Sequence, residues 1–349
     1  MSTSRIFATT GTWRTLIMGW ALVLVSSTFV WAQDSARKAV LGGIQLASDE
    51  DASPQPMPQQ AAPKAANCTS CCNLWDVTKE SICGTCCERV WTPLCLDTLF
   101  SEGWCESWIA PPSGCSGAPR HGWINTFDGF FTREFHLAYA FTDGLAGGSD
   151  AHLGLFTFNT PLSRRLWLGI DVPFVVSLQG GADNATNFGD IVLTPKVMLQ
   201  DTQHMSLSAG VSIQVPTGSA STGGDLTALF PHVDLWTDIG DGWSLRGGTG
   251  FVIPTERDVS PDAVWVANAS IGRTVTCHDA APLGDFTYYL ATNLRQDIGG
   301  GDDRTFLSFT PGIRTHLGNN YFFLAGVEVP VTGPQQFDER IIFVIVKGF

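Results

Sequence analysis

The chain has 349 residues, of which 15% are charged, and it contains 37 Gly, 22 Phe and 12 Trp but only 5 Met. Low charge together with many glycines and aromatics favours strands and tight turns over helices. The formal net charge of −13 argues against nucleic acid as a partner, because proteins that bind it present basic surfaces.

Residues 1–32 have the pattern of a secretory signal peptide. Arg5 and Arg14 precede the apolar stretch 16–30, and Val30-Trp31-Ala32 places small or β-branched residues at the two positions that a signal peptidase tests. The alternative is a membrane-anchoring helix, but such a helix needs about 20 apolar residues, more than this stretch provides. We therefore expect export and cleavage.

Residues 33–66 are expected to form a disordered linker, because a segment so rich in Pro, Ala and Gln cannot bury enough apolar surface to offset the entropy of the chain. Nine of the 10 cysteines then follow between Cys68 and Cys115. This density is typical of a small cross-linked module. We assign residues 67–120 to such a module, located in the periplasm or acting as a plug.

The cysteines allow two kinds of chemistry. An exported chain meets an oxidising compartment, so disulfides are the first expectation. The disulfide candidates are Cys68, Cys71, Cys72, Cys83, Cys86, Cys87, Cys95, Cys105, Cys115 and Cys277. The spacing C-x2-C-x11-C-x2-C of Cys68, Cys71, Cys83 and Cys86 could instead hold Zn or an iron centre; no other cofactor is expected. Because the module has an odd number of cysteines, we expect Cys277 to pair with one of them and to dock the module beneath or inside the rest of the fold.

Residues 121–349 predict an all-β fold, an antiparallel transmembrane β-barrel of about 12 strands. Residues 205–215 are the clearest strand, since apolar residues alternate there with polar or small ones without a break. The expected strands are 133–141, 151–160, 165–177, 189–200, 205–216, 226–237, 243–253, 262–275, 285–297, 304–316, 321–331 and 338–349. Their number is even, as a single-chain bacterial barrel requires. A soluble two-sheet sandwich is the alternative fold.

The connections and the C-terminus fit a barrel in the bacterial outer membrane. Short connections alternate with longer, Gly-rich or acidic ones, which is the asymmetry between periplasmic turns and extracellular loops. The chain ends on Phe349, which resembles the terminal aromatic residue that the barrel-assembly machinery reads, although Lys347 stands where an apolar residue is usual. Residues 341–346 are apolar on both faces, so the inner face of this last strand is expected to pack against something inside the barrel. The cysteine module is the candidate.

Seven prolines fall in or beside the expected strands, although proline cannot donate a hydrogen bond to a β-ladder. They are Pro173, Pro195, Pro216, Pro231, Pro254, Pro311 and Pro330. In this topology each lies toward the extracellular end of its strand. We therefore expect a collar of prolines at one rim of the barrel.

The less apolar face of each strand is assigned to the lumen. The lumen candidates are Glu134, His136, Asp171, Asp190, Lys196, His232, Asp234, Arg246, Asn293, Arg295, Arg314 and Glu328. Charges of both signs in a pore can select the permeant. The same residues could instead pair with one another and fill a narrow interior.

Enzymatic chemistry has little support in the sequence. Some barrels are hydrolases, and this chain has His136, His152, His232 and His278 along with many serines. The seven histidines are scattered singly, however, and the sequence has neither a G-x-S-x-G motif nor a pair of histidines at metal-binding spacing. No catalytic residue is expected.

Two strand-end motifs carry a family resemblance. The stretches F-G-D-I-V-L-T-P-K-V-M-L at 188–199 and V-S-I-Q-V-P-T-G at 211–218 resemble the outer-membrane family named for the MetA pathway of phenol degradation. The cysteine-rich segment has no counterpart in that family pattern. The resemblance implies a barrel that passes small, including hydrophobic or aromatic, solutes.

These observations lead to three functional hypotheses. The first is an outer-membrane channel or transporter, whose partners would be membrane lipid, the barrel-assembly machinery and a small-molecule permeant. The second is a non-transporting barrel that anchors the disulfide-rich or metal-binding module in the periplasm. The third is an outer-membrane hydrolase.

Overall fold

The computed structural model describes residues 73–83, 90–112, 118–145, 148–180, 184–222, 227–255, 261–299, 304–332 and 335–349. The expected signal peptide and linker lie outside these residues. Within this part of the chain, no helix is long and apolar enough to cross a membrane.

Thirteen strands form one antiparallel sheet. They are β1 (Glu134–Leu145), β2 (Ser149–Pro161), β3 (Leu166–Gln179), β4 (Ala185–Asn187), β5 (Ile191–Asp201), β6 (Met205–Val215), β7 (Ala228–Gly240), β8 (Trp243–Pro254), β9 (Ala263–Thr274), β10 (Gly284–Ile298), β11 (Thr305–Gly318), β12 (Tyr321–Pro330) and β13 (Glu339–Gly348). The short β4 pairs with the end of β3 and is an addition to the twelve expected strands. The prediction of a 12-stranded antiparallel barrel is confirmed.

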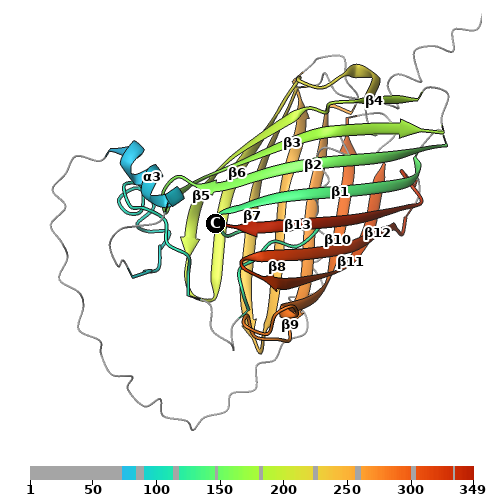
Figure 1. Cartoon of the computed structure of the whole chain (residues 1–349). Coiled ribbons are helices and arrows are strands. Elements are labelled where there is room, and N and C mark those ends of the chain that lie inside the picture. Colours follow the sequence, from blue (N-terminus) through green and yellow to red (C-terminus); the bar gives the residue numbers. More distant parts are fainter. Residues whose placement is uncertain are drawn as a thin grey trace, which may run out of the picture.

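The barrel closes between the first strand and the last. β1 pairs with β2 on one side and with β13 on the other, in a register that runs from Glu134↔Gly348 to Asp143↔Glu339. Figure 1 shows β13 lying beside β1, with the C-terminus next to the start of β1. Closure gives each of the twelve long strands two neighbours, as the satisfaction of backbone hydrogen bonds in lipid demands.

Alternation along each strand decides which side chains face outward. In β1, the side chains of Phe135, Leu137 and Tyr139 are 37%, 54% and 45% exposed, whereas Ala138 and Ala140 are buried. The outward set is the apolar one, as expected of a surface that contacts lipid hydrocarbon. The inner face receives the small and polar residues.

The connections differ between the two ends of the barrel. We call the end with the tight connections the turn end; it also holds the start of β1 and the end of β13. The hairpin between β11 and β12 turns on Asn319 and Asn320, which both adopt positive φ, at 50° and 57°. That conformation matches the twist of a two-residue β-hairpin. The opposite end, the loop end, carries most of the longer connections, as predicted; the exceptions are the short β1–β2 connection at the loop end and the long β9–β10 turn, residues 275–283, at the turn end.

The predicted collar of prolines is confirmed only in part: all seven lie toward the loop end of their strands, but only three lie at the rim. Pro216, Pro254 and Pro330 lie at the loop ends of their strands, but Pro173, Pro195, Pro231 and Pro311 lie inside strands, at several depths. Each interior proline instead lies at an interruption of the pairing between its strand and one of the two neighbouring strands. Pro173 lies at the β2–β3 bulge, and Pro195, Pro231 and Pro311 fall in two-residue gaps of the β5–β6, β7–β8 and β11–β12 ladders. The missing N–H therefore dictates a local lapse of pairing but not its height in the barrel.

The C-terminal residue fastens the seam of the barrel. The ring of Phe349 stacks on Phe135 of β1, with centroids 4.5 Å apart, and lies 5.9 Å from Phe158 of β2. The unexpected Lys347 is accommodated at the turn end. Its Nζ donates a hydrogen bond of 2.5 Å to the carbonyl of Asn319 and lies 4.6 Å from the ring centroid of Tyr321.

Residues 118–133, which precede β1, fill much of the barrel interior; we call them the plug segment. The side chains of Trp123, Ile124, Phe127, Phe130 and Phe131 are all at most 4% exposed. They pack against inward-facing residues of the strands. The plug segment is therefore the partner that the inner face of the last strand was expected to have. It consists of residues on either side of the predicted boundary at 120 and contains no cysteine.

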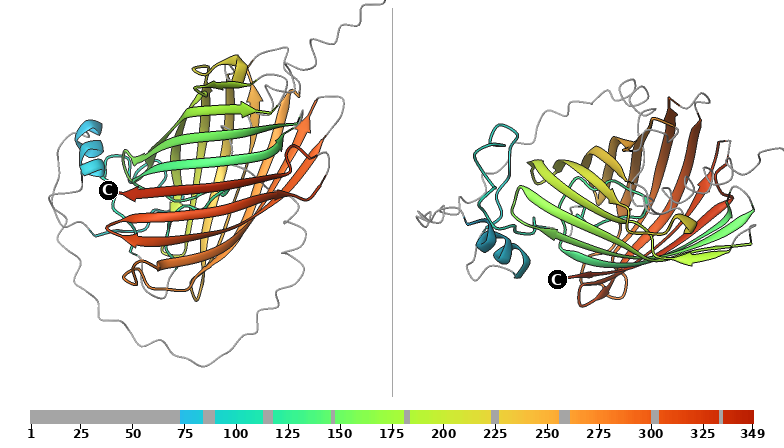
Figure 2. Two further views of the ribbon diagram at one scale, coloured as in Figure 1. Left: turned by 45° about the vertical axis from the view of Figure 1, so that its right-hand side comes forward. Right: turned by 90° about the horizontal axis from the view of Figure 1, so that it is seen from above.

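A second element, the cap, consists of α3 (Leu74–Cys83) and residues 90–112. Figure 2 shows α3 outside the barrel wall, at the end where the C-terminus lies. Leu94 and Asp201, at the end of β5, exchange two backbone hydrogen bonds of 2.8 Å. Arg165, in the β2–β3 turn, donates hydrogen bonds to the carbonyls of Cys95 and Glu102. The cap is therefore held on the turn end of β2, β3 and β5.

Candidate functional site

The plug segment packs against the barrel wall through buried aromatic and apolar side chains. Trp123 stacks on Tyr289 of β10, with ring centroids 4.7 Å apart and planes 5° from parallel. The hydroxyl of Tyr289 accepts a hydrogen bond of 2.9 Å from the backbone N–H of Ile124. The same cluster includes Ile342 and Val344, from the inner face of β13. Apolar burial explains why both faces of the last strand are apolar.

A polar network holds the centre of the plug segment. The Asn125 side chain donates to Thr310 Oγ1 at 2.9 Å and to Glu328 Oε2 at 3.0 Å. The Asn268 side chain donates to the Asn125 carbonyl at 2.6 Å. Glu328 also accepts a hydrogen bond of 2.9 Å from Arg340. A buried carboxylate satisfied by charged and neutral donors fixes geometry more than it adds stability.

A second network surrounds Asp128. Arg246 Nη1 donates to its carboxylate at 2.7 Å, and Lys196 Nζ donates to its backbone carbonyl at 3.2 Å. Lys196 also bonds Asp234 at 2.6 Å, and Asp234 lies 2.7 Å from Nδ1 of His232. The plug segment thus provides one carboxylate to a chain of opposite charges along the wall.

Glycines permit the close approach of the plug segment to the wall. A Cβ atom at Gly129 would lie 2.7 Å from the carbonyl oxygen of Ser206 and 2.8 Å from that of Asp234. Backbone atoms cannot move aside as a flexible side chain can. Gly129 is therefore required for the plug segment to lie where it does.

We expect Gly129→Ala to destabilise the seating of the plug segment by about 1–3 kcal/mol, the usual cost of overpacking. The matched control is Gly326→Ala in β12, where a Cβ atom would meet its nearest neighbours at 3.4 Å, an ordinary contact. Hydrogen exchange of the amides of residues 118–133 measures the effect. Equal exchange in the two variants would contradict this assignment.

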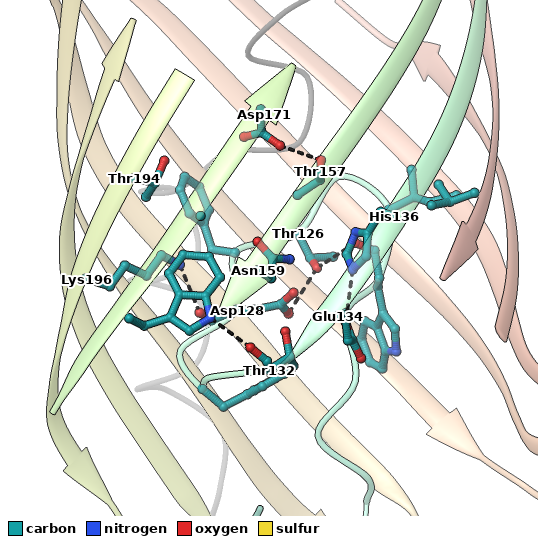
Figure 3. Close-up of a pocket in the computed structure, with 18 of the residues that line it drawn as sticks. Thr126, Asp128, Thr132, Glu134, His136, Thr157, Asn159, Asp171, Thr194 and Lys196 are labelled. Atoms are coloured by element: carbon teal, nitrogen blue, oxygen red, sulfur yellow. Dashed lines mark hydrogen bonds and ion pairs between the residues drawn. The ribbon is translucent and has the colours of Figure 1, made fainter. Parts of the chain in front are cut away.

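An inner cavity of about 120 Å³ lies between the plug segment and the wall, where residues of β1 to β7 form most of its lining and Arg314, Leu324 and Val344 of β11, β12 and β13 complete it. Figure 3 shows its polar lining: Thr126, Asp128 and Thr132 come from the plug segment, and Glu134, His136, Thr157, Asn159, Asp171, Thr194 and Lys196 come from the strands. Asp171 accepts a hydrogen bond of 2.5 Å from Thr157. The cavity is large enough for several water molecules or a small solute.

A larger mouth cavity, of about 440 Å³, lies at the turn end between the cap, the plug segment and the rim of the barrel. Its lining includes the aromatic side chains of Trp108, Phe131, Trp236, Phe322 and Phe349. Three residues, Thr132, Glu134 and Arg314, line both cavities. They mark the boundary between the inner cavity and the mouth.

The structure places the predicted lumen residues on the inner side of the wall. Asp190, His232, Asp234, Arg246, Asn293, Arg295, Arg314, Glu328 and Glu134 are buried, and His136, Asp171 and Lys196 are half-buried. Glu134, His136, Asp171, Lys196, His232 and Arg314 surround the inner cavity. Asp190 and Glu328 instead bond to Gln214 and to Ser308 and Arg340, away from this cavity. Arg295 forms an ion pair of 3.4 Å with Asp297.

Sequence reasoning missed the residues that fill the lumen. Asp128 lies in a stretch without periodicity, so no local pattern indicated a position inside the barrel. Tyr289 and Arg340 face inward on β10 and β13, which were both expected as strands. Listing every inward-facing residue of these two strands would have included them. The aromatic and glycine content of residues 122–131 was the available signal for a buried segment.

The histidines considered for hydrolysis have other partners. His136 bonds Glu134 at 2.9 Å, His232 bonds Asp234, and His278 bonds Asp285 at 2.6 Å. His152 faces outward and bonds the hydroxyl of Tyr139 at 2.7 Å. The expectation that the chain is not an enzyme stays a prediction.

Most of the predicted cysteine chemistry lies outside the described residues, including Cys68, Cys71, Cys72, Cys86, Cys87 and Cys115. Cys83 and Cys95 carry free thiols, and Cys105 is disulfide-bonded. Cys277 lies in the turn between β9 and β10, at the turn end. Among the described residues no group of His, Cys, Asp and Glu is arranged to hold a metal ion. The pairing of Cys277 and the metal site of Cys68, Cys71, Cys83 and Cys86 stay predictions.

Comparison with known protein families gives one match. The model of the family described as "Putative MetA-pathway of phenol degradation" matches residues 131–339. No curated protein sequence matches the chain.

Solved structures resemble the barrel. The COG4313 outer membrane channel from Pseudomonas putida F1 is 17% identical, with a TM-score of 0.50 over 62% of this chain and 94% of that one. The NanC porin is 10% identical, with a TM-score of 0.43 over 62% and 99%. The outer membrane phospholipase A from Escherichia coli is 12% identical, with a TM-score of 0.38 over 62% and 96%. At 17% identity the likeness to the COG4313 channel shows the barrel fold alone.

Proposed function

The chain belongs to the family described as "Putative MetA-pathway of phenol degradation", which the motifs at its strand ends already resembled. We propose that it is an outer-membrane channel for small solutes. The observation that carries this proposal is the pair of cavities beside the plug segment. The inner cavity and the mouth cavity share Thr132, Glu134 and Arg314. A solute that moves past these three residues would pass from the lumen to the turn end.

The plug segment sets the size of that path. Trp123 and Ile124 pack in one apolar cluster with residues of β1 to β3 and β10 to β13, while most of the polar lining of the inner cavity comes from β1 to β7. A path of this kind admits small solutes while the plug segment stays in place. Hydrophobic or aromatic solutes are included in the proposal, because aromatic side chains line the mouth cavity and the family is described by a pathway of phenol degradation.

We further propose that the turn end faces the periplasm, since short turns lie on that side in bacterial barrels. The signal peptide, the disulfides and the periplasmic place of the cap belong to the same proposal. Insertion of the barrel by the assembly machinery would follow export.

Liposome swelling tests the proposal. Vesicles containing the full chain are expected to admit small neutral solutes such as glycerol and to exclude disaccharides, because the inner cavity is small. Vesicles without protein provide the baseline. Swelling no faster than this baseline for every solute would overturn the channel and favour the anchor.

The anchor hypothesis keeps one specific observation in its favour. The cap presents Phe100 and Trp75, whose side chains are 91% and 73% exposed. Exposed apolar side chains mark a contact surface where they form a contiguous patch, and these two are the candidates for one on the cap. An anchoring role would leave permeability at the baseline while the cap binds a partner, so the swelling assay separates the two.

A further inference from the structure

Arg314 has hydrogen-bond donors that the fold leaves unused. Its side chain is fully buried, and Nη1 donates to the Gly122 carbonyl at 3.0 Å. Among the described residues, Nε and Nη2 have no hydrogen-bond partner. A buried guanidinium ordinarily satisfies its donors, because desolvation without compensation is costly.

The nearest carboxylate does not meet this need. Glu134 Oε1 lies 3.7 Å from Nη2, beyond hydrogen-bond distance, and Oε2 of the same group is engaged by His136 at 2.9 Å. His121 lines the same mouth cavity, and burial followed by the nearby Arg314 and Arg246 holds its pKa well below the ordinary value. A neutral ring adds no positive charge, so it does not compete with Arg314 for an anion.

The donors of Arg314 are oriented as a fork. Nε and Nη2 lie on one edge of the guanidinium plane and match the two oxygens of a carboxylate. Arg314 lines both cavities, so its buried guanidinium lies at the boundary between them. The guanidinium carbon also lies 4.2 Å from the ring centroid of Phe322.

The mouth cavity offers room for the rest of such a ligand. Trp108, Phe131, Trp236 and Phe322 are among its lining residues. Aromatic side chains of this kind favour a flat apolar body beside a few polar anchors. The combination selects an acid with an aromatic body over a small inorganic anion.

We propose that Arg314 binds the carboxylate of a small aromatic acid, whose ring occupies the mouth cavity. This inference rests on the proposed channel function and assigns it a solute class. The site lies where the inner cavity meets the mouth cavity, so a bound acid would be held at the boundary between them.

Equilibrium dialysis of benzoate against the purified full chain in detergent tests the site. We expect saturable binding that is weakened about 100-fold by Arg314→Gln and about 10-fold by Arg314→Lys, since lysine keeps the charge but not the fork. The control is Arg273→Gln, at an arginine that bonds the Asp241 carbonyl and stacks on Trp243, outside both cavities. Benzyl alcohol, which has the ring without the carboxylate, should bind more weakly than benzoate.

Migration on unheated gels verifies that each variant is a folded barrel. Benzoate binding to Arg314→Gln and Arg314→Lys as tight as to the wild type would overturn the site, as would the absence of binding to the wild type. Swelling with glycerol in the same preparations reports the channel separately. A protein that passes glycerol but does not bind benzoate refutes this inference and leaves the proposed function standing.

Discussion

Replacing Arg165 with alanine is expected to release the cap from the barrel. The guanidinium is fully buried and donates five hydrogen bonds: to the carbonyls of Cys95, Glu102, Met198 and Leu199 and to Oγ1 of Thr98. Hydrogen bonds to a charged group are worth about 1.5–3 kcal/mol each, and truncation leaves buried carbonyls without a donor. We expect the cap to lose about 3 kcal/mol or more of its docking free energy.

Hydrogen exchange of the Leu94 amide measures this loss, because that amide bonds the carbonyl of Asp201 in the docked state. A loss of about 3 kcal/mol corresponds to exchange about 100-fold faster. The control is Arg164→Ala at the adjacent position, where the ion-pair partner Glu106 is 43% exposed; exposed pairs contribute about 1 kcal/mol or less. Similar exchange rates in the two variants would contradict the role assigned to Arg165.

Replacing Trp123 with alanine is expected to loosen the plug segment and to widen the path. Trp123 is 4% exposed and stacks on Tyr289, and its ring centroid lies 3.6 Å from the guanidinium carbon of Arg246. Truncating a buried Trp usually costs about 3–5 kcal/mol. Because the barrel wall itself is closed by backbone pairing, we expect this loss to fall on the plug segment.

Swelling of liposomes in disaccharides measures the widening. The Trp123→Ala protein should admit a disaccharide that the wild type excludes. Trp75→Ala, which truncates a tryptophan that is 73% exposed on the cap, serves as the control and should leave the size limit unchanged. If Trp123→Ala kept the wild-type size limit, the plug segment would not be what restricts the path.

The barrel could be predicted from the sequence because its pattern is local. A strand with one face to lipid alternates at every second residue, so residues 205–215 could be recognised as a strand without knowledge of their partners. Closure then followed from the even number of strands and from Phe349. The inward position of Glu134, Arg246 and Arg314 followed from the same alternation.

The contents of the barrel could not be predicted in this way. The plug segment has no period, and its contacts with Tyr289, Arg246 and Glu328 join residues more than one hundred positions apart. Charge pairing inside the lumen depends on which strands face each other across it, and no short-range pattern encodes this. The depth of the interior prolines could not be predicted for a related reason. Each accompanies a lapse in one ladder, and the height of that lapse depends on the neighbouring strand.

The central claim is that solutes pass beside the plug segment through the inner cavity. The most direct test is single-channel recording of Thr194→Cys, which replaces a buried hydroxyl in the lining of that cavity. A charged, membrane-impermeant methanethiosulfonate reagent should reduce its current. The same reagent should leave unchanged the wild type and Thr249→Cys, where the native side chain bonds Trp265 on the outer side of β8. Current that the reagent does not alter in Thr194→Cys, or the absence of current in the wild type, would contradict passage through this cavity.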